Sequence, residues 1–411
     1  MSGVSVARRM AAALMGLVMA AATLAGAPPP GHAQSSAAQA AAANQGFETR
    51  AEQAILIDHE SGTVLYEKNA DKLFPPASLA KMMTIAVLFD LIKAGKVSME
   101  TEFVVSEHAW RTGGAPSRTS STFLPINSKA TVNDLIQGII VQSGNDAAIT
   151  VAEGIAGTEQ AFGELMTKKA REIGMPKSVF HNPTGLPDPD QKITAREYST
   201  LTRYIISNHP DLYKVYGQRE FTYNKIRQFN RNPLLAEGIG ADGLKTGYIK
   251  ESGYNIVGSA VQNGQRLVLV MGGFKTEKER QEDARRLMEW GFRNFEQITL
   301  FKAGEPAGEA SVFGGTEGRV KLVGAKAINV LVPRGNRDKL RARIVYRGPV
   351  RAPVEKGVQI GKLQVLRDET VIQETPLYTA DAVGLGTLQS RAMDAVLEVV
   401  GRVARETVGF Q

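Results

Sequence analysis

The chain has 411 residues, of which 43% are hydrophobic and 22% charged, an ordinary composition for a soluble globular protein of two or three domains. It contains no cysteine, which excludes disulfides, zinc ribbons, iron–sulfur sites and thiol nucleophiles, and its five histidines have no metal-binding spacing, so we expect neither a metal nor a cofactor. The net charge of +7 suits an anionic lipid surface or a cell-wall polymer but is too diffuse to indicate nucleic acid as a partner.

Residues 1–33 have the features of a secretory signal peptide. Arg8 and Arg9 precede an apolar run over 10–27, and small residues flank an expected cleavage site next to Ala33. An uncleaved membrane anchor is the alternative, although the run is rich in Ala and Gly and short for a membrane span. Residues 34–46 are nearly all Ala, Ser, Gln and Asn, which predicts a flexible linker. We therefore expect the mature chain to be exported and to work in a bacterial periplasm.

Residues 47–300 predict an α/β domain whose sheet combines strands from both ends of the segment. Its expected elements are a hairpin over 54–66, a helix over 78–93, a helix pair over 133–151, and two strands over 252–261 and 266–273 that meet at an Asn-Gly turn. Capping boxes at Thr194 and Thr276, each with a Glu three residues later, predict the starts of two more amphipathic helices. The second of these should turn Leu287, Met288, Trp290, Phe292 and Phe295 toward a core.

The pattern changes at residue 301. Residues 301–384 contain short alternating runs separated by Gly and Pro, which predict a small all-β sandwich domain. Residues 385–411 predict an amphipathic helix with Val400 on its apolar side and Arg402 on its polar side. Such a helix can pack on the β domain or lie in a membrane interface, and its terminal position favours the membrane surface.

Three short strings occur once each, in a fixed order: Ser78-Leu-Ala-Lys81, Ser143-Gly-Asn145 and Lys245-Thr-Gly247. Any one of them alone is a weak signal. A helical i, i+3 pair places the Lys81 amine beside the Ser78 hydroxyl, and lysine can take the serine proton if burial and a second cation such as Lys245 lower its pKa. A backbone amide at a helix N-terminus can stabilise the negative charge that develops on an attacked carbonyl. The three strings together therefore predict an acyl-transfer site.

These strings resemble the motifs of the penicilloyl serine transferases, the superfamily of penicillin-binding proteins and serine β-lactamases. Longer segments over 76–84, 142–147, 182–186 and 242–248 are similar to those of low-molecular-mass D-alanyl-D-alanine carboxypeptidases. The predicted β domain and terminal helix resemble the type-5 subgroup. The resemblance implies a β-lactamase/transpeptidase-like mixed sheet with helices, peptidoglycan stem peptides as substrates and β-lactams as covalent inhibitors. It also implies a position on the periplasmic face of the inner membrane.

The resemblance also implies roles for individual residues. Ser78 would be acylated by the penultimate D-Ala of the stem peptide, with Lys81 as general base, and the terminal D-Ala would leave. Ser143, together with Lys245, would pass a proton to the leaving amine. Asn145 would position the substrate amide.

The Lys-Thr-Gly string and the residue after it would complete the substrate site. Thr246 would bind the terminal carboxylate, Gly247 belongs to the same binding strand, and the Tyr248 amide would share an oxyanion hole with the amide of Ser78. Arg280 is a candidate counter-ion for that carboxylate, and the alternative for it is a solvated charge on its helix.

Other functions share parts of this pattern. A class A β-lactamase needs a deacylating glutamate, typically in Glu-x-x-Leu-Asn, and the sequence has no such string. A D,D-endopeptidase would use the same residues but usually lacks the β domain. A non-catalytic penicillin sensor or scaffold would have no reason to keep the nucleophile together with its base.

Overall fold

The structure is a computed structural model that describes residues 46–334, 340–367, 369–389 and 391–392. The described residues form two compact units that divide between Phe295 and Glu296. The predicted signal peptide, almost all of the predicted linker, and residues 393–411 of the predicted terminal helix lie outside the described residues. Within the described ranges, no helix combines the length and the apolar character needed to cross a bilayer.

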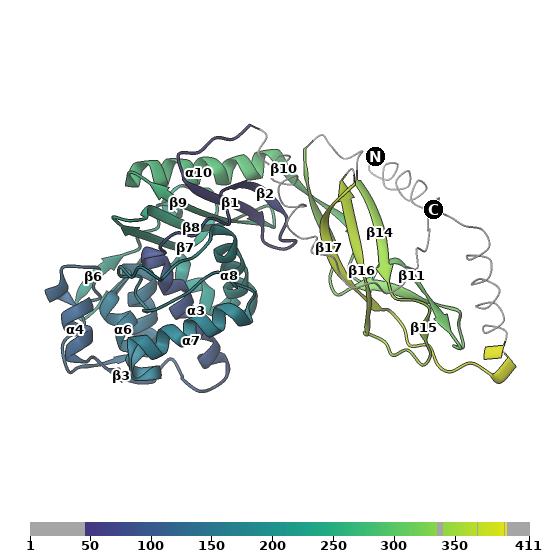
Figure 1. The fold of residues 1–411 in the computed structure, drawn as a ribbon, viewed down its shortest axis with the longest axis horizontal. Helices are drawn as coiled ribbons and strands as arrows, with labels where there is room; N and C mark the ends of the chain where they lie inside the picture. Colours follow the sequence, from purple (N-terminus) through teal and green to yellow (C-terminus); the bar gives the residue numbers. More distant parts are fainter. Residues whose placement is uncertain (1–45, 335–339, 368, 390, 393–411) are drawn as a thin grey trace. The chain divides into compact units, whose positions relative to one another are not determined.

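A five-stranded antiparallel sheet forms the centre of the first unit (Figure 1). The strand order is β2-β1-β9-β8-β7, and Gln53 at the start of the unit pairs with Gly272 near its end. The predicted sheet of N- and C-terminal pieces is therefore confirmed. The strands are β1 (Gln53–Asp58), β2 (Val64–Lys68), β7 (Ala241–Ile249), β8 (Gly253–Gln262) and β9 (Gln265–Phe274).

Helices cover both faces of this sheet, with α10 on one face and α8 on the other (Figure 1). All six residues of β1 are buried, as expected for a strand with helices on both sides. The α-helices are α3 (Ala80–Lys93), α4 (Glu107–Gly113), α5 (Val132–Gln137), α6 (Asn145–Ala156), α7 (Glu159–Glu172), α8 (Ala195–Asn208), α9 (Pro210–Tyr213) and α10 (Glu277–Asn294). Short helical turns are η1 (Ala77–Leu79), η2 (Ala115–Ser117), η3 (Gly138–Gln142), η4 (Lys214–Gly217) and η5 (Pro233–Ala236).

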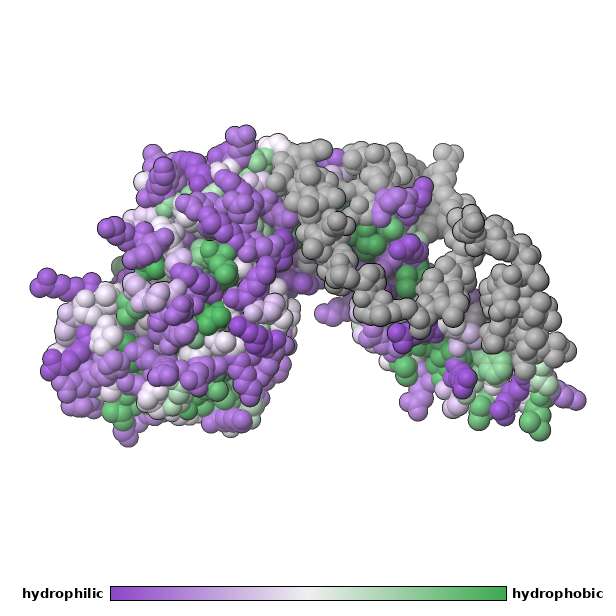
Figure 2. Space-filling view, in the orientation of Figure 1, coloured by the Kyte–Doolittle hydropathy of each residue, from purple (hydrophilic) through white to green (hydrophobic). Residues whose placement is uncertain are grey.

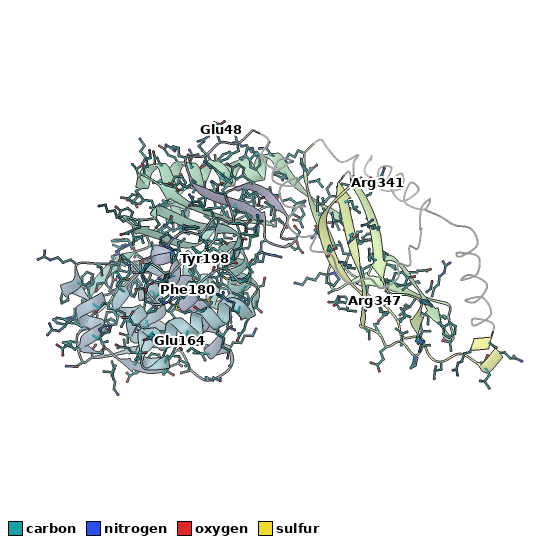
Figure 3. All side chains as sticks on the ribbon, viewed as in Figure 1. Glu48, Glu164, Phe180, Tyr198, Arg341 and Arg347 are labelled. Carbon is teal, nitrogen blue, oxygen red and sulfur yellow. The ribbon has the colours of Figure 1, made fainter. Side chains whose placement is uncertain are left out.

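The helical layer has its own apolar interior. Tyr198 on α8 and Phe180 lie buried inside it, whereas Glu164 on α7 is exposed (Figure 3). The outer surface of this unit is mostly hydrophilic in the view of Figure 2, with hydrophobic side chains scattered among polar ones. The predicted apolar face of α10 is buried, including Leu287 and Met288. Two small hairpins complete the unit: β3 (Glu102–Val104) with β4 (Lys129–Thr131), and β5 (Glu220–Tyr223) with β6 (Ile226–Phe229).

Local sequence signals explain several of these boundaries. The two residues between β8 and β9, Asn263 and Gly264, have φ values of +51° and +80°, the left-handed conformations that a two-residue hairpin turn requires. At the start of α10, Thr276 and Glu279 form the predicted reciprocal capping box. At α8 only half of that box forms. Thr194 accepts a hydrogen bond from the Glu197 amide, but the buried Glu197 carboxylate accepts instead from Lys177 N and Ser178 Oγ.

The second unit is all-β, as predicted. A six-stranded sheet in the order β14-β16-β17-β12-β11-β15 and the pair β10-β13 share one apolar core, so the unit is a sandwich. The strands are β10 (Phe295–Phe301), β11 (Pro306–Phe313), β12 (Arg319–Gly324), β13 (Ile328–Pro333), β14 (Leu340–Tyr346), β15 (Val350–Arg351), β16 (Gln359–Arg367) and β17 (Thr370–Thr379). Leu385, where the terminal helix is predicted to begin, forms an isolated antiparallel bridge with Gly315.

Candidate active site

Ser78 lies in the turn η1 that leads into α3, and its side chain lines a cavity of about 600 Å³. Ala77, just before it, has a φ of +48°, a left-handed conformation that a non-glycine residue rarely adopts. Such strain is concentrated at functional sites. The serine is thus held at the surface of the cavity by the first turns of a buried helix.

Lys81 is completely buried one turn later and lies beside Ser78, with 3.1 Å between Nζ and Oγ. Its Nζ also donates hydrogen bonds of 2.6 Å each to Asn145 Oδ1 and to the Thr184 carbonyl oxygen. Burial, and then the nearby positive charge of Arg231, lower the pKa of Lys81 to about 7. The amine can therefore be neutral near physiological pH, as a general base must be.

The turn from Ser143 to Asn145 lies between η3 and α6 and forms one side of the site. Ser143 has a φ of +65°, and its buried Oγ has no hydrogen-bond partner within the described part of the chain. A Cβ at position 144 would lie 1.9 Å from Thr122 Oγ1, so only glycine fits between Ser143 and Asn145 in the chain. Asn145 binds Lys81 through its oxygen and Thr119 Oγ1, at 2.9 Å, through its nitrogen.

The opposite side is β7, the edge strand of the sheet, which carries Lys245, Thr246 and Gly247. Lys245 is buried and donates a hydrogen bond of 3.1 Å to the Thr246 carbonyl oxygen. Burial, followed by the charges of Lys81, Arg231 and Arg280, holds the pKa of Lys245 well below its usual range. The two lysines of the motifs therefore lie within electrostatic reach of each other.

Arg280 on α10 is only 3% exposed, so it is not a solvated helix charge. It pairs with Glu277 at 2.5 Å, its guanidinium lies 5.7 Å from the centre of the Tyr254 ring, and its Nε has no hydrogen-bond partner among the described residues. Burial lowers its pKa, but a guanidinium stays charged. A buried cation with an unused donor can bind an anion, although Arg280 itself does not line the cavity.

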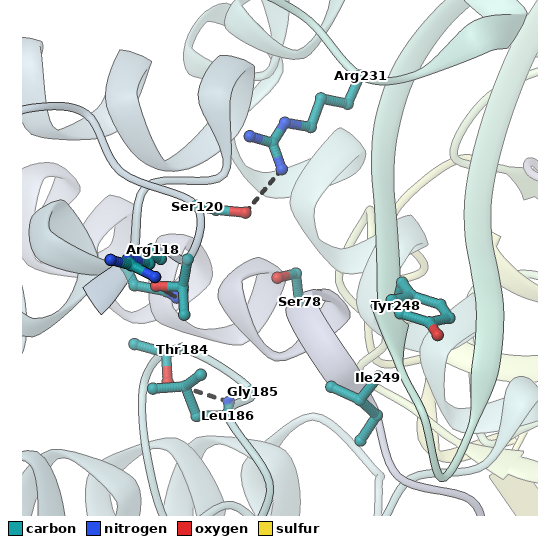
Figure 4. A pocket seen from close by; sticks show the side chains of 11 residues that line it. Ser78, Arg118, Ser120, Thr184, Gly185, Leu186, Arg231, Tyr248 and Ile249 are labelled. Atoms are coloured by element: carbon teal, nitrogen blue, oxygen red, sulfur yellow. Dashed lines mark hydrogen bonds between the residues drawn. The ribbon is translucent and has the colours of Figure 1, made fainter. Parts of the chain in front are cut away.

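The structure adds site residues that the motifs did not indicate. The carbonyl oxygen of Thr184 holds Lys81, and next to it a Cβ at Gly185 would lie 1.7 Å from the Ala77 carbonyl oxygen. Arg118 and Arg231 line the cavity, and Ser78 lies between Arg118 and Tyr248 in the close view (Figure 4). Thr184 belongs to a segment that already showed family resemblance, whereas nothing in the local sequence of either arginine marked it.

A further residue, Asp146, connects the turn at Ser143 to the loop at residues 121–124. Its buried carboxylate accepts hydrogen bonds from the amides of Thr122, Leu124 and Ala147 and from Ser121 Oγ. These contacts fix the loop that carries the cavity wall against the start of α6. The geometry as a whole provides a nucleophile, a neutralisable base, a second buried cation and a strand edge, which are the parts of an acyl-transfer site.

Comparison with known proteins gives consistent results over both units. Residues 37–276 match the family described as D-alanyl-D-alanine carboxypeptidase, and residues 295–384 match the family described as penicillin-binding protein 5, C-terminal domain. The D-alanyl-D-alanine carboxypeptidase DacC of Escherichia coli (strain K12) is 38% identical over 346 residues, covering 84% of this chain and 86% of that protein. The DacA enzyme of Haemophilus influenzae is 37% identical, covering 84% and 89%.

Solved structures agree. Penicillin-binding protein 5 from Haemophilus influenzae is similar with a TM-score of 0.75 and 36% identity, covering 82% of this chain and 98% of that one. Penicillin-binding protein D2 from Listeria monocytogenes, solved in its ampicillin-bound form, has a TM-score of 0.52 and 29% identity, covering 60% of this chain and 99% of that one.

Proposed function

This chain belongs to the D-alanyl-D-alanine carboxypeptidase family of low-molecular-mass penicillin-binding proteins, and we propose how its residues carry out the reaction. It is a serine-type carboxypeptidase that removes the terminal D-Ala of peptidoglycan stem peptides through an acyl-enzyme and is inhibited by β-lactams. The nucleophile is Ser78. The observation that carries this assignment is the contact between Ser78 Oγ and the fully buried amine of Lys81.

Lys81 acts as the general base. A neutral lysine amine has two hydrogens and one lone pair. Its two hydrogens form hydrogen bonds with two carbonyl-type oxygens, Asn145 Oδ1 and Thr184 O. The lone pair then faces the hydroxyl of Ser78 and accepts its proton as Oγ attacks the penultimate D-Ala carbonyl. The low pKa makes this protonation state available at neutral pH.

Ser143 passes the proton to the leaving D-Ala amine, supported by Lys245. The buried Oγ of Ser143 supports this role, because it has no hydrogen-bond partner among the described residues and can bond a substrate nitrogen. The amides of Ser78 and Tyr248 form the oxyanion hole, and the fit of Gly247 against Ser78 supports it: a Cβ there would lie 3.0 Å from the Ser78 nitrogen.

Substrate binding uses the remaining motif residues. Asn145 holds the amide on the acyl side of the scissile bond. Thr246 binds the terminal carboxylate, with Arg280 as its counter-ion. The buried position of Arg280 supports this role, as does its Nε, which has no hydrogen-bond partner in the described part of the chain. Water then hydrolyses the acyl-enzyme, whereas a β-lactam leaves a slowly hydrolysed adduct on Ser78.

The test combines mass spectrometry of the protein after benzylpenicillin with an assay of free D-Ala from a pentapeptide ending in D-Ala-D-Ala. We expect a slow-decaying adduct on Ser78 and D-Ala release, and Ser78→Ala should abolish both. Rapid loss of the adduct with drug hydrolysis and no D-Ala release would instead indicate a β-lactamase. Turnover that survives in Ser78→Ala would overturn the mechanism.

We also propose where the enzyme works. Residues 1–33 direct export to the periplasm, and the amphipathic helix over 385–411 holds the enzyme on the inner-membrane surface. A chain that ends at residue 386 should move from the membrane fraction to the soluble periplasmic fraction. If its distribution does not change, the terminal helix is not the anchor.

A further inference from the structure

The lining of the cavity beside Ser78 is positively charged, although Glu277 stabilises the charge of Arg231 from outside the lining. Of the eleven residues that line it, Arg118 and Arg231 are the charged ones, and none is Asp or Glu. Cavity walls with one sign of charge attract ligands of the opposite sign. The lining therefore indicates that a bound substrate brings a negative group to this cavity.

The two arginines differ in how they are engaged. Arg231 donates a hydrogen bond of 2.6 Å to Ser120 Oγ. The Arg118 side chain has no ion pair and no hydrogen bond within the described part of the chain, and it is exposed to the cavity. Its guanidinium keeps all five N–H donors available, in the fork that matches a carboxylate.

Arg118 is nevertheless held in place by its backbone. It has a φ of +55° at the end of η2, in a turn that Ser117 closes by bonding the Gly114 carbonyl and the Thr119 hydroxyl. Thr119 Oγ1 in turn accepts the hydrogen bond from Asn145 Nδ2. The residues on either side of Arg118, Ser117 and Thr119, are thus hydrogen-bonded to each other, and Thr119 is bonded to Asn145, which holds the substrate amide in the proposed function.

That connection tells which part of the substrate reaches Arg118. The terminal carboxylate lies on the leaving-group side, where Thr246 and Arg280 are assigned to it. Asn145 holds the amide on the other side of the scissile bond, and the residue that precedes the two alanines extends beyond that amide. Because Arg118 lines the cavity next to Thr119, the hydrogen-bond partner of Asn145, we place it on this side.

We propose that Arg118, with Arg231 also lining the cavity, binds a carboxylate on the residue that precedes D-Ala-D-Ala and so makes the enzyme selective for acidic stem peptides. The inference rests on the proposed function, because it uses the roles of Ser78 and Asn145. It assigns Arg118 as a specificity-determining residue and gives it no part in the chemical step.

The experiment compares three acetylated tripeptides, with L-Glu, L-Gln or L-Lys before D-Ala-D-Ala, by kcat/KM from released D-Ala. A charge-assisted hydrogen bond to an arginine predicts about a tenfold preference for Glu over Gln, with Lys poorest. The preference should shrink in about 1 M salt, where the screening length falls to about 3 Å. In Arg118→Gln the Glu/Gln ratio should approach one, and Arg118→Lys should recover part of it.

Arg351→Gln serves as the matched control, because Arg351 is an exposed arginine of the second unit and should leave the ratio as in the wild type. A wild-type ratio near one, or an unchanged ratio in Arg118→Gln, would overturn the inference. If the Gln peptide is hydrolysed under those outcomes, the carboxypeptidase assignment stands without it. If no peptide is hydrolysed and benzylpenicillin does not label Ser78, the specificity role of Arg118 and the carboxypeptidase assignment are both wrong.

Discussion

A Cβ on Gly247 would lie 3.0 Å from the backbone nitrogen of Ser78. The edge strand β7 therefore meets the nucleophile's own amide so closely that a methyl group at this position would force β7 or η1 to shift by a few tenths of an ångström. Because that amide is assigned to the oxyanion hole, the contact connects the packing of the sheet against η1 directly to catalysis.

Gly247→Ala should slow acylation of Ser78 by about ten- to a hundredfold, because the methyl group must push β7 or η1 away and misplace a hydrogen-bond donor. The measurement is the rate of benzylpenicillin labelling. Gly318→Ala is the control, since a Cβ at Gly318 has no atom within 4 Å. Labelling at the wild-type rate in Gly247→Ala would show that the strand can shift without cost to the reaction.

Arg231→Gln should move the acid limb of the acylation profile to higher pH. The positive charge of Arg231 disfavours protonated Lys81 and so lowers its pKa, which lies at about 7; removing that charge raises the pKa and leaves less neutral base at any pH below it. The measurement is the acylation rate from pH 5 to 9. Ser120→Ala, which removes the hydrogen bond of Arg231 but keeps its charge, should leave the midpoint in place. A shift toward lower pH would contradict the electrostatic account.

Asp146→Asn should reduce the free energy of unfolding of the first unit by about 3 kcal/mol. The amide retains one oxygen as acceptor and turns an NH₂ group toward donors that now lack partners, which is costly in a buried site. Ser121→Ala removes one of the four hydrogen bonds and should cost about 1 kcal/mol. Trp110 and Trp290, the two tryptophans of the chain, both lie in the first unit, so urea denaturation followed by their fluorescence reports on that unit. Equal losses in the two variants would contradict this account.

Glu197→Ala should destabilise the first unit more than Glu279→Ala, although both residues stand at the same place in the same sequence pattern. The Glu279 carboxylate accepts from two exposed amides at the start of α10, so its removal should cost about 1 kcal/mol. The Glu197 carboxylate is buried and satisfies Lys177 N and Ser178 Oγ, so its removal should cost about 2–3 kcal/mol. The same denaturation assay measures both, and a larger loss at Glu279 would refute the distinction.

That pair of glutamates also shows what the sequence could predict. Signals that act over a few residues were recovered: the capping residues Thr194 and Thr276, the Asn-Gly turn between β8 and β9, and the spacing that places Lys81 beside Ser78. The second bond of the capping box failed at α8 because a partner distant in the chain, the loop at Lys177, competes for the carboxylate.

In the active site, too, features set by neighbouring residues were predictable from the sequence, and features that depend on distant segments were not. Ser78, Lys81 and Asn145 come together as the motifs predicted, since each motif carries its own side chain to the cavity. The Thr184 carbonyl is a backbone group with no side-chain signature, and Arg118 and Arg231 reach the cavity from loops whose path depends on the whole fold. The pattern of residues along the sequence does not predict the course of these loops.

The pairing of β1 with β9 has a consequence for the newly made chain. Gln53 emerges from the ribosome early, but its partner Gly272 follows only when nearly the whole first unit has been synthesised. Until then β1 has an unpaired edge, and η1 lacks the strand β7 that packs against Ser78. Pairing between distant segments is slow because the intervening loop must close first. The nucleophile is therefore made before most of the first unit, yet its site is completed only when β7 and β9 have followed, so a chain that stops before β7 cannot carry a functional Ser78.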